Sequence, residues 1–259
     1  MLMGRFSTLV REVGILAAMD IKIGTAIVVA TGWMISLCLH EFGHAVVAYA
    51  GGDKSVKDKG YLTLNPLKYT DPGLTLVVPL LILMIGGIAL PGAAVYIDRR
   101  RLHNRLWHSL VSLAGPLGNM LVLGIIAIPF MLGMSANSQS WIWPSLALLA
   151  LFQAIAIILN LLPIPPLDGY GVIEPWLPKG MREAANKFGS YGIWILFAVL
   201  WFVKPLNALL WLSGYATIML LGIPPELAQA GYDIFRKQSY LLMIAIIAVL
   251  VISKAFKRK

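Results

Sequence analysis

The stretch TGWMISLCLHEFGHAVVAY, residues 31–49, contains the pentapeptide HEFGH at positions 40–44. On a helix, residues i and i+4 lie on one face, so the imidazoles of His40 and His44 can bind the same metal ion. Glu41 follows His40 directly and can reach a metal-bound water as a general base. The pattern therefore predicts a metal site with a general base beside it.

The flanks of this pentapeptide are almost wholly apolar from Ile23 onward. Ionisable groups are costly inside a bilayer, and one that lies there is by default a candidate functional residue. Three such groups at metal-ligand spacing favour a functional site over simple packing. The alternative is a helix of the kind found in soluble proteins, in which both histidines are core residues with satisfied hydrogen bonds.

The composition is that of a membrane protein. Of the 259 residues, 59% are hydrophobic and 13% are charged, whereas a soluble domain is about one quarter charged. The mean hydropathy is +0.79. We expect one integral membrane domain over residues 1–259. The net charge of +9 lies mainly in loops and tails such as Arg99–Arg101. Such clusters indicate topology and contact with anionic lipid, and we expect neither a nucleic-acid nor a nucleotide partner.

The apolar segments predict an all-α polytopic membrane protein with about five to six transmembrane helices. The first helix runs over Ile23–Tyr49 and stops at Gly51-Gly52, which places the histidines inside the bilayer but near one face. The other expected segments are Leu106–Leu132, Ile142–Leu162, a polar connector Glu174–Lys187, Tyr191–Val203, Leu206–Ile223 (spanning or lying flat) and Tyr240–Ile252. We expect a core of about residues 23–203, preceded by an amphipathic N-terminal segment or mobile tail at 1–22. Residues 224–259 supply a polar loop, an extra C-terminal helix and a basic tail.

Residues 73–97 are apolar but are interrupted by Pro79, by two adjacent glycines and by Pro91. The segments on either side, 53–72 and 98–105, both carry excess Lys and Arg, which favours the cytoplasmic side for both. We therefore expect a re-entrant, partly extended element between the first and second core helices. Irregular backbone is tolerated at membrane depth where it lines a protein cavity. A kinked transmembrane helix is the alternative.

The third core segment ends in a run that contains Asn160, Pro163, Pro165, Pro166 and Asp168. The prolines forbid regular helix, and such a rigid segment can hold a carboxylate in a fixed place. Asp168 has no cation nearby in the sequence. Because a buried, unpaired aspartate is costly, it needs a partner, and a metal ion is a suitable one.

Three motifs together resemble the site-2 protease family of intramembrane zinc metalloproteases, in particular the small bacterial members without a PDZ domain. These motifs are HEFGH at 40–44, GPLGN at 115–119 and NLLPIPPLDG at 160–169. The first and third are specific, whereas the second alone would indicate only a packing kink between helices.

The resemblance implies a zinc endopeptidase that cleaves peptide bonds in or near transmembrane segments of membrane-protein substrates, in regulated intramembrane proteolysis. The implied ligands of one zinc ion per chain are His40, His44 and Asp168. Two imidazoles and one carboxylate leave a tetrahedral zinc ion one open position for water. Glu41 would activate the zinc-bound water, Asn160 would hold the substrate backbone, and Asn119 would help to line the site. The implied location is the bacterial cytoplasmic membrane, with the active site nearer the cytoplasmic face.

Two other classes of protein fit part of the pattern. A non-proteolytic zinc-binding membrane protein could use the same scaffold as a partner-binding or chaperone module, but a structural zinc site needs no base and usually closes its fourth position. A transporter would fit broken helices with polar groups at depth, but the sequence has no paired repeat. Glu174 is the alternative third ligand if Asp168 is not one.

Overall fold

The computed structural model describes residues 2–65, 95–138 and 140–237. Within these ranges every regular element is a helix, which confirms the predicted all-α class. The short elements are α2 (Ser55–Asp58), the 3-10 helices η3 (Arg99–Arg101) and η4 (Glu174–Trp176), and α6 (Asp168–Ile173).

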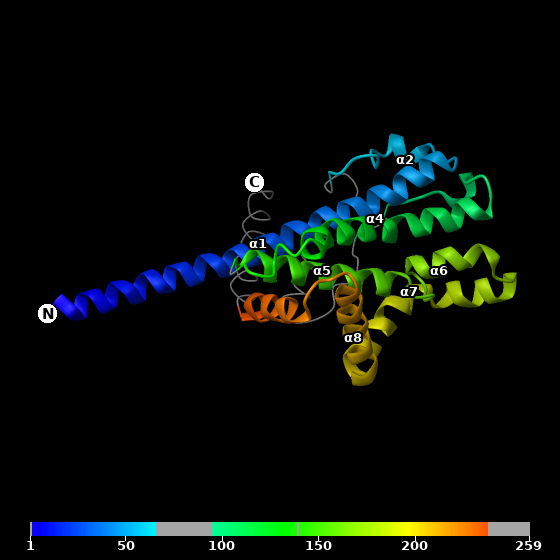
Figure 1. Cartoon of the computed structure of the whole chain (residues 1–259). Helices are drawn as coiled ribbons and strands as arrows, with labels where there is room; N and C mark the ends of the chain where they lie inside the picture. The colour runs from blue at the N-terminus through cyan, green and yellow to red at the C-terminus, as the bar shows by residue number, and fades with distance from the viewer. Residues whose placement is uncertain (1, 66–94, 139, 238–259) are drawn as a thin grey trace, which may run out of the picture.

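Three long helices form the centre of the molecule. They are α1 (Leu2–Ala50), α4 (Arg105–Met131) and α5 (Ile142–Asn160). Each packs against the other two, and α4 runs opposite to α1 and α5 (Figure 1). The C-terminal ends of α1 and α5 therefore lie at the same end of the bundle, together with α6 (Figure 1).

The three central helices are long and apolar enough to cross a membrane, α1 over its part Ile23–Ala50. A bent pair, Trp194–Phe202 with Lys204–Leu220, is a fourth candidate span. The chain is therefore an integral membrane protein with three to four candidate spans among the described residues. The predicted re-entrant element, except for residues 95–97, and the predicted helix Tyr240–Ile252 lie outside the described residues.

The central position of α5 follows from its sequence. Its residues are apolar on all sides, and a helix of that kind is stable only when it is surrounded by other elements or lipid. Nearly all its side chains from Ala147 to Leu159 are buried. Its neighbours are α1, α4 and α8 (Lys204–Leu220). Polar side chains on α5 are therefore enclosed by protein and not by water.

The second half of the chain differs from the prediction in how its helices are divided. The expected connector Glu174–Lys187 and the expected span Tyr191–Val203 are not separate, because one helix, α7 (Lys179–Phe202), covers most of both. Pro205 lies in the first turn of α8, where proline is tolerated. The axes of the α7 and α8 segments meet at 95°.

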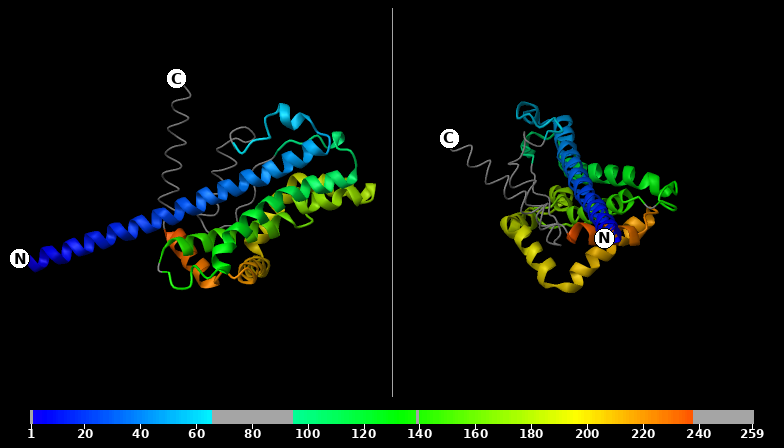
Figure 2. Two further views of the ribbon diagram at one scale, coloured as in Figure 1. Left: turned by 45° about the horizontal axis from the view of Figure 1, so that its top comes forward. Right: turned by 90° about the vertical axis from the view of Figure 1, so that its left-hand side faces the viewer.

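The two ends of the described chain also differ from the prediction. The segment 1–22 was expected to be separate from the first span, but α1 continues without a break from Leu2 and projects beyond the bundle (Figure 2). Residues 225–237 were expected to belong to a polar loop, but they form a helix. Phe235 of this helix is buried and packs edge-on against Phe152 of α5.

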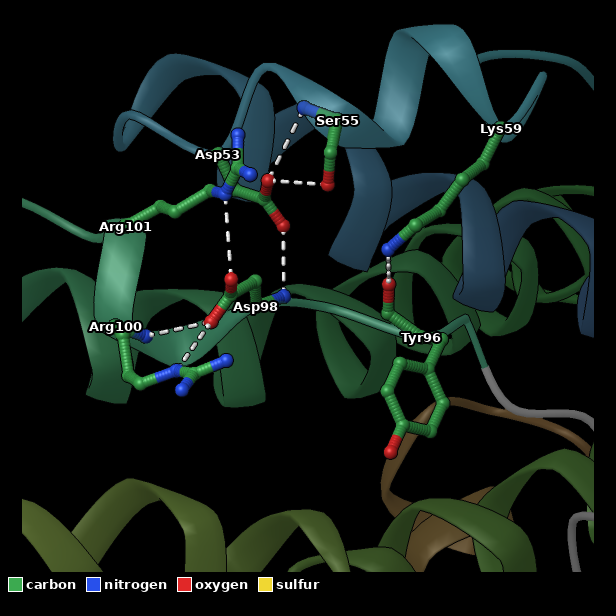
Figure 3. Close-up of polar contacts among 7 residues, drawn as sticks. All are labelled: Asp53, Ser55, Lys59, Tyr96, Asp98, Arg100 and Arg101. Atoms are coloured by element: carbon green, nitrogen blue, oxygen red, sulfur yellow. Dashed lines mark hydrogen bonds and ion pairs between the residues drawn. The ribbon is translucent and has the colours of Figure 1, made fainter.

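A cluster of polar contacts ties the loop after α1 to the segment before α4 (Figure 3). The buried Asp53 carboxylate accepts hydrogen bonds from Ser55 through Oδ1 and from the backbone N–H of Asp98 through Oδ2, at 2.7 Å. Asp98 accepts hydrogen bonds from the side chain and backbone of Arg100, which hold the pKa of Asp98 below its usual value. These contacts fix residues 95–98 beside the C-terminal end of α1.

Candidate metal centre

Three side chains from distant parts of the chain meet near the C-terminal end of α1. His40 Nε2 lies 3.2 Å from Asp168 Oδ2, and His44 Nε2 lies 3.3 Å from Asp168 Oδ1. The two Nε2 atoms are 3.1 Å apart. One ligand atom from each residue lies within 4.8 Å of the others, so the group could hold a metal ion. In the described part of the chain, no other group of three His, Cys, Asp or Glu side chains has this geometry.

The donor atoms and their spacing fit zinc. In tetrahedral sites, zinc binds imidazole nitrogen and carboxylate oxygen at about 2.0–2.2 Å, so neighbouring ligand atoms lie about 3.3 Å apart. The two Nε2 atoms lie 3.1 Å apart, and each lies within 3.3 Å of one of the two Asp168 carboxylate oxygens, so the separations are close to that value. Two imidazoles and one carboxylate are a donor set of catalytic zinc sites, in which the fourth position stays open.

Gly115 of α4 provides the space in which the two histidines meet. A Cβ atom at this position would lie 2.3 Å from His44 Nε2 and 2.6 Å from His40 Nε2. A side chain there would displace the ligand atoms themselves. The sequence alone indicated a packing role for this glycine, whereas the structure places it against the metal-binding group.

The two histidines are held differently. His44 Nδ1 lies 2.6 Å from the backbone carbonyl oxygen of Val111 on α4. Donation of the Nδ1 proton to this carbonyl leaves the Nε2 lone pair directed at the metal-binding group, an arrangement that is usual for histidine ligands. His40 Nδ1 is buried and has no hydrogen-bond partner among the described residues.

Asp168 is the first residue of α6, directly after the proline-rich segment. The neighbouring Gly169 allows α6 to fold back on the end of α5, because a Cβ atom there would lie 2.1 Å from the carbonyl oxygen of Leu161. The Asp168 carboxylate lies between the two histidines, with Oδ2 toward His40 Nε2 and Oδ1 toward His44 Nε2, and an aspartate carboxyl group is ordinarily ionised at neutral pH. The group is therefore an anionic donor.

Glu174, the alternative ligand, does not belong to this group. Its Oε2 accepts a hydrogen bond from Arg99 Nη1 at 2.6 Å, and its Oε1 accepts one from Asn186 Nδ2 at 3.1 Å. Asn186 Oδ1 in turn accepts the hydroxyl proton of Tyr170 at 2.9 Å. Burial raises the pKa of Tyr170, so this hydroxyl stays protonated. Glu174 therefore anchors the segment that follows Asp168.

Glu41 is buried on α1, with 2% of its surface exposed. Residues three apart on a helix are neighbours, so Glu41 lies on the same side of α1 as His44. Its Oε2 accepts a hydrogen bond of 3.0 Å from the backbone N–H of Val95. This bond holds the Glu41 carboxylate against the segment 95–98.

A cavity adjoins His40 on the side away from the end of α1. Its volume is about 20 Å³, room for about one water molecule, and it opens to the outside. Both predicted substrate-binding residues, Asn119 and Asn160, are buried and line it. So do Ser36 and Gln153, which the sequence analysis missed. A signal for Gln153 was present: it is an amide inside the apolar run of the third core segment, two helical turns before Asn160.

Comparison with known proteins identifies relatives over most of the chain. Rip2 of Mycolicibacterium smegmatis, named as a zinc metalloprotease, is 41% identical over 214 residues, which cover 83% of this chain and 82% of the relative. Rip2 of Mycobacterium tuberculosis, named in the same way, is 40% identical over 215 residues, 82% of this chain and 81% of the relative. YwhC of Bacillus subtilis, also named as a zinc metalloprotease, is 38% identical over 187 residues, 69% of this chain and 81% of the relative. No family model matches the chain, and no solved structure matches it significantly. The level and extent of identity confirm the family that the three motifs predicted, and this chain belongs to the site-2 protease family of membrane zinc metalloproteases.

Proposed function

We propose that this zinc metalloprotease is an intramembrane endopeptidase that hydrolyses peptide bonds in or near transmembrane segments of membrane-protein substrates. One observation carries the proposal. Both histidines of the metal-binding group and the buried Glu41 lie on a helix that is long and apolar enough to cross a membrane. A peptide bond that reaches Glu41 must therefore enter the membrane-spanning part of the protein.

The proposal gives each residue of the site a role. The zinc ligands are His40, His44 and Asp168. When bound, zinc polarises the carbonyl group of the scissile bond and lowers the pKa of the attacking water. Glu41 accepts the proton from this water and transfers it to the leaving amine. The hydrogen bond from the backbone N–H of Val95 orients the Glu41 carboxylate for both transfers.

The substrate must change conformation before it is cut. A transmembrane helix satisfies its peptide groups in i→i−4 hydrogen bonds, and these must open locally to expose one bond. In the membrane interior an unpaired peptide group is costly, so the enzyme has to supply new partners. Asn119 and Asn160 are suited to this role because their amide side chains line the cavity beside His40.

We place the active site near the cytoplasmic face of a bacterial cytoplasmic membrane. His44 precedes the end of α1 at Ala50 by six residues, or about 9 Å along the axis. Exposed basic residues, including Lys54, Lys57 and Arg100, lie in the loops at this end. Loops rich in Lys and Arg favour the cytoplasmic side, and water reaches the zinc from the nearer face.

Reconstitution in lipid nanodiscs tests the proposed activity. We expect the zinc-loaded protein to cleave within the membrane-embedded part of at least one single-span protein from a panel of host membrane proteins. We also expect a zinc chelator to abolish cleavage and added zinc to restore it. Mass spectrometry of the products locates the cut. Cleavage confined to water-exposed segments, or cleavage that persists without zinc, would contradict the proposal.

A further inference from the structure

We propose that Gln153 binds the main chain of an unwound substrate segment by donating a hydrogen bond from its side-chain amide to a substrate carbonyl oxygen. The inference rests on the proposed function, because it requires a peptide to widen the cavity beside His40 and lie in it. It adds a substrate-binding residue on α5, deeper in the membrane than the metal-binding group.

The side-chain amide of Gln153 is buried but only half satisfied. The residue is 1% exposed and lines the cavity together with His40 and Asn160. Its Oε1 accepts a hydrogen bond from Ser36 Oγ at 2.6 Å. Its Nε2 has no hydrogen-bond partner among the described residues. An unsatisfied donor in a buried setting favours any ligand that brings an acceptor.

The contacts of Ser36 indicate that the unpaired atom is the donor. A hydroxyl group has one proton, and Ser36 Oγ lies 2.6 Å from Gln153 Oε1 and 3.1 Å from Asn119 Oδ1. The shorter distance is typical of an O–H···O bond and too short for most N–H···O bonds. Ser36 therefore donates to Gln153 Oε1. The Asn119 contact is satisfied when the Asn119 amide is turned over, so that its nitrogen takes the place of Oδ1 and donates to Ser36 Oγ. Gln153 Nε2 then stays available to the cavity.

An unwound peptide carries the complementary acceptors. Each opened i→i−4 bond frees one carbonyl oxygen, and the interior of the protein offers few donors for it. Gln153 and Asn160 are seven residues apart, about two turns and 10.5 Å along the same face of α5. This distance equals about three residues of extended chain. A peptide that runs along α5 can contact both amides, so we infer that the enzyme selects substrates that unwind over about three residues.

Peptide binding without turnover tests the inference. The probe is a synthetic Leu/Ala transmembrane peptide with a central Gly-Gly interruption, compared with an unbroken Leu/Ala helix, and the protein is the zinc-loaded Glu41→Gln variant in nanodiscs. Fluorescence anisotropy gives the dissociation constants.

We expect the interrupted peptide to bind more tightly than the unbroken one. Gln153→Met should weaken binding of the interrupted peptide roughly threefold to tenfold, as expected for one hydrogen bond, and should leave binding of the unbroken peptide unchanged.

An ester scan separates a direct hydrogen bond from a structural effect. Single amide-to-ester replacements near the interruption make one carbonyl at a time a poorer acceptor. We expect one ester position to weaken binding to the protein that retains Gln153 and to have no further effect in the Gln153→Met variant, because coupled changes are not additive. Equal penalties for all esters in both proteins would mean that a water molecule or the fold is the partner, and would overturn the inference.

Ser145 supplies the matched control. Its hydroxyl group is hydrogen-bonded to the hydroxyl group of Thr25 at 2.9 Å, a buried contact between the same two helices, and it does not line the cavity. Ser145→Ala should leave peptide binding unchanged. Equal affinities for the two peptides, or unchanged affinity in Gln153→Met, would overturn the inference. Cleavage of embedded proteins by the wild-type enzyme, which retains Glu41, is measured in a separate assay. A failure of the inference about Gln153 can therefore be distinguished from a failure of the proposed function.

Discussion

Replacement of Glu41 by Gln is expected to lower the rate of peptide cleavage by about 10² to 10⁴-fold, the contribution of a positioned general base. The amide cannot accept the proton of the attacking water. Its oxygen can still accept the hydrogen bond from the backbone N–H of Val95 that the Glu41 carboxylate accepts at 3.0 Å. The substitution therefore removes the base while the fold and zinc content stay as they are. Initial rates in nanodiscs with a cleaved substrate measure the effect.

Glu226→Gln is the matched control for this change. Glu226 is exposed on the helix over residues 225–237, so the same loss of a carboxylate there should leave cleavage unchanged. Zinc content and the circular dichroism spectrum should be the same for the wild type and both variants. A Glu41→Gln protein that cleaves at the wild-type rate would show that another group activates the water.

Replacement of Gly115 by Ala is expected to weaken zinc binding strongly. The new Cβ atom would lie 2.3 Å from His44 Nε2 and 2.6 Å from His40 Nε2, so both imidazoles must move. His44 cannot move freely, because its Nδ1 is hydrogen-bonded to the backbone carbonyl oxygen of Val111. We expect the affinity for zinc to fall about 10- to 100-fold, as when groups that support metal ligands are lost. Competition with a fluorescent chelator measures this affinity.

Gly124 offers a control on the same helix. A Cβ atom at that position would meet nothing within 4 Å. Gly124→Ala should leave zinc affinity unchanged and should stabilise α4 slightly, because alanine is the better helix former by about 0.5–1 kcal/mol. Unchanged zinc affinity in Gly115→Ala would mean that the imidazoles do not bind metal in the arrangement seen here.

Much of the site could be predicted from the sequence because its chemistry depends on local spacing. The i, i+4 spacing of the histidines required only that residues 40–44 be helical, and they are. Asp168 was predicted as a partner because a rigid proline-rich run precedes an unpaired carboxylate, and the structure brings it within 3.3 Å of both histidines. Each of these features is encoded within about ten residues of chain.

Features that depend on packing between helices could not be predicted in this way. The role of Gly115 follows from how closely α1 and α4 approach, and the role of Gln153 follows from a cavity between α1, α4 and α5. The continuity of α7 was missed for another reason. The residues from Met181 to Lys187 are mostly good helix formers, so one helix continues from them into the apolar segment although hydropathy changes sharply.

The three-ligand site can be tested by measuring the zinc content of the purified wild type, of Asp168→Ala and of the exposed control Asp58→Ala. We expect about one zinc ion per chain in the wild type and in Asp58→Ala, as a three-ligand site requires. We expect a large loss of zinc in Asp168→Ala. Wild-type zinc content in folded Asp168→Ala, or no zinc in the folded wild type, would contradict the assignment of His40, His44 and Asp168 as the ligands of a catalytic zinc ion.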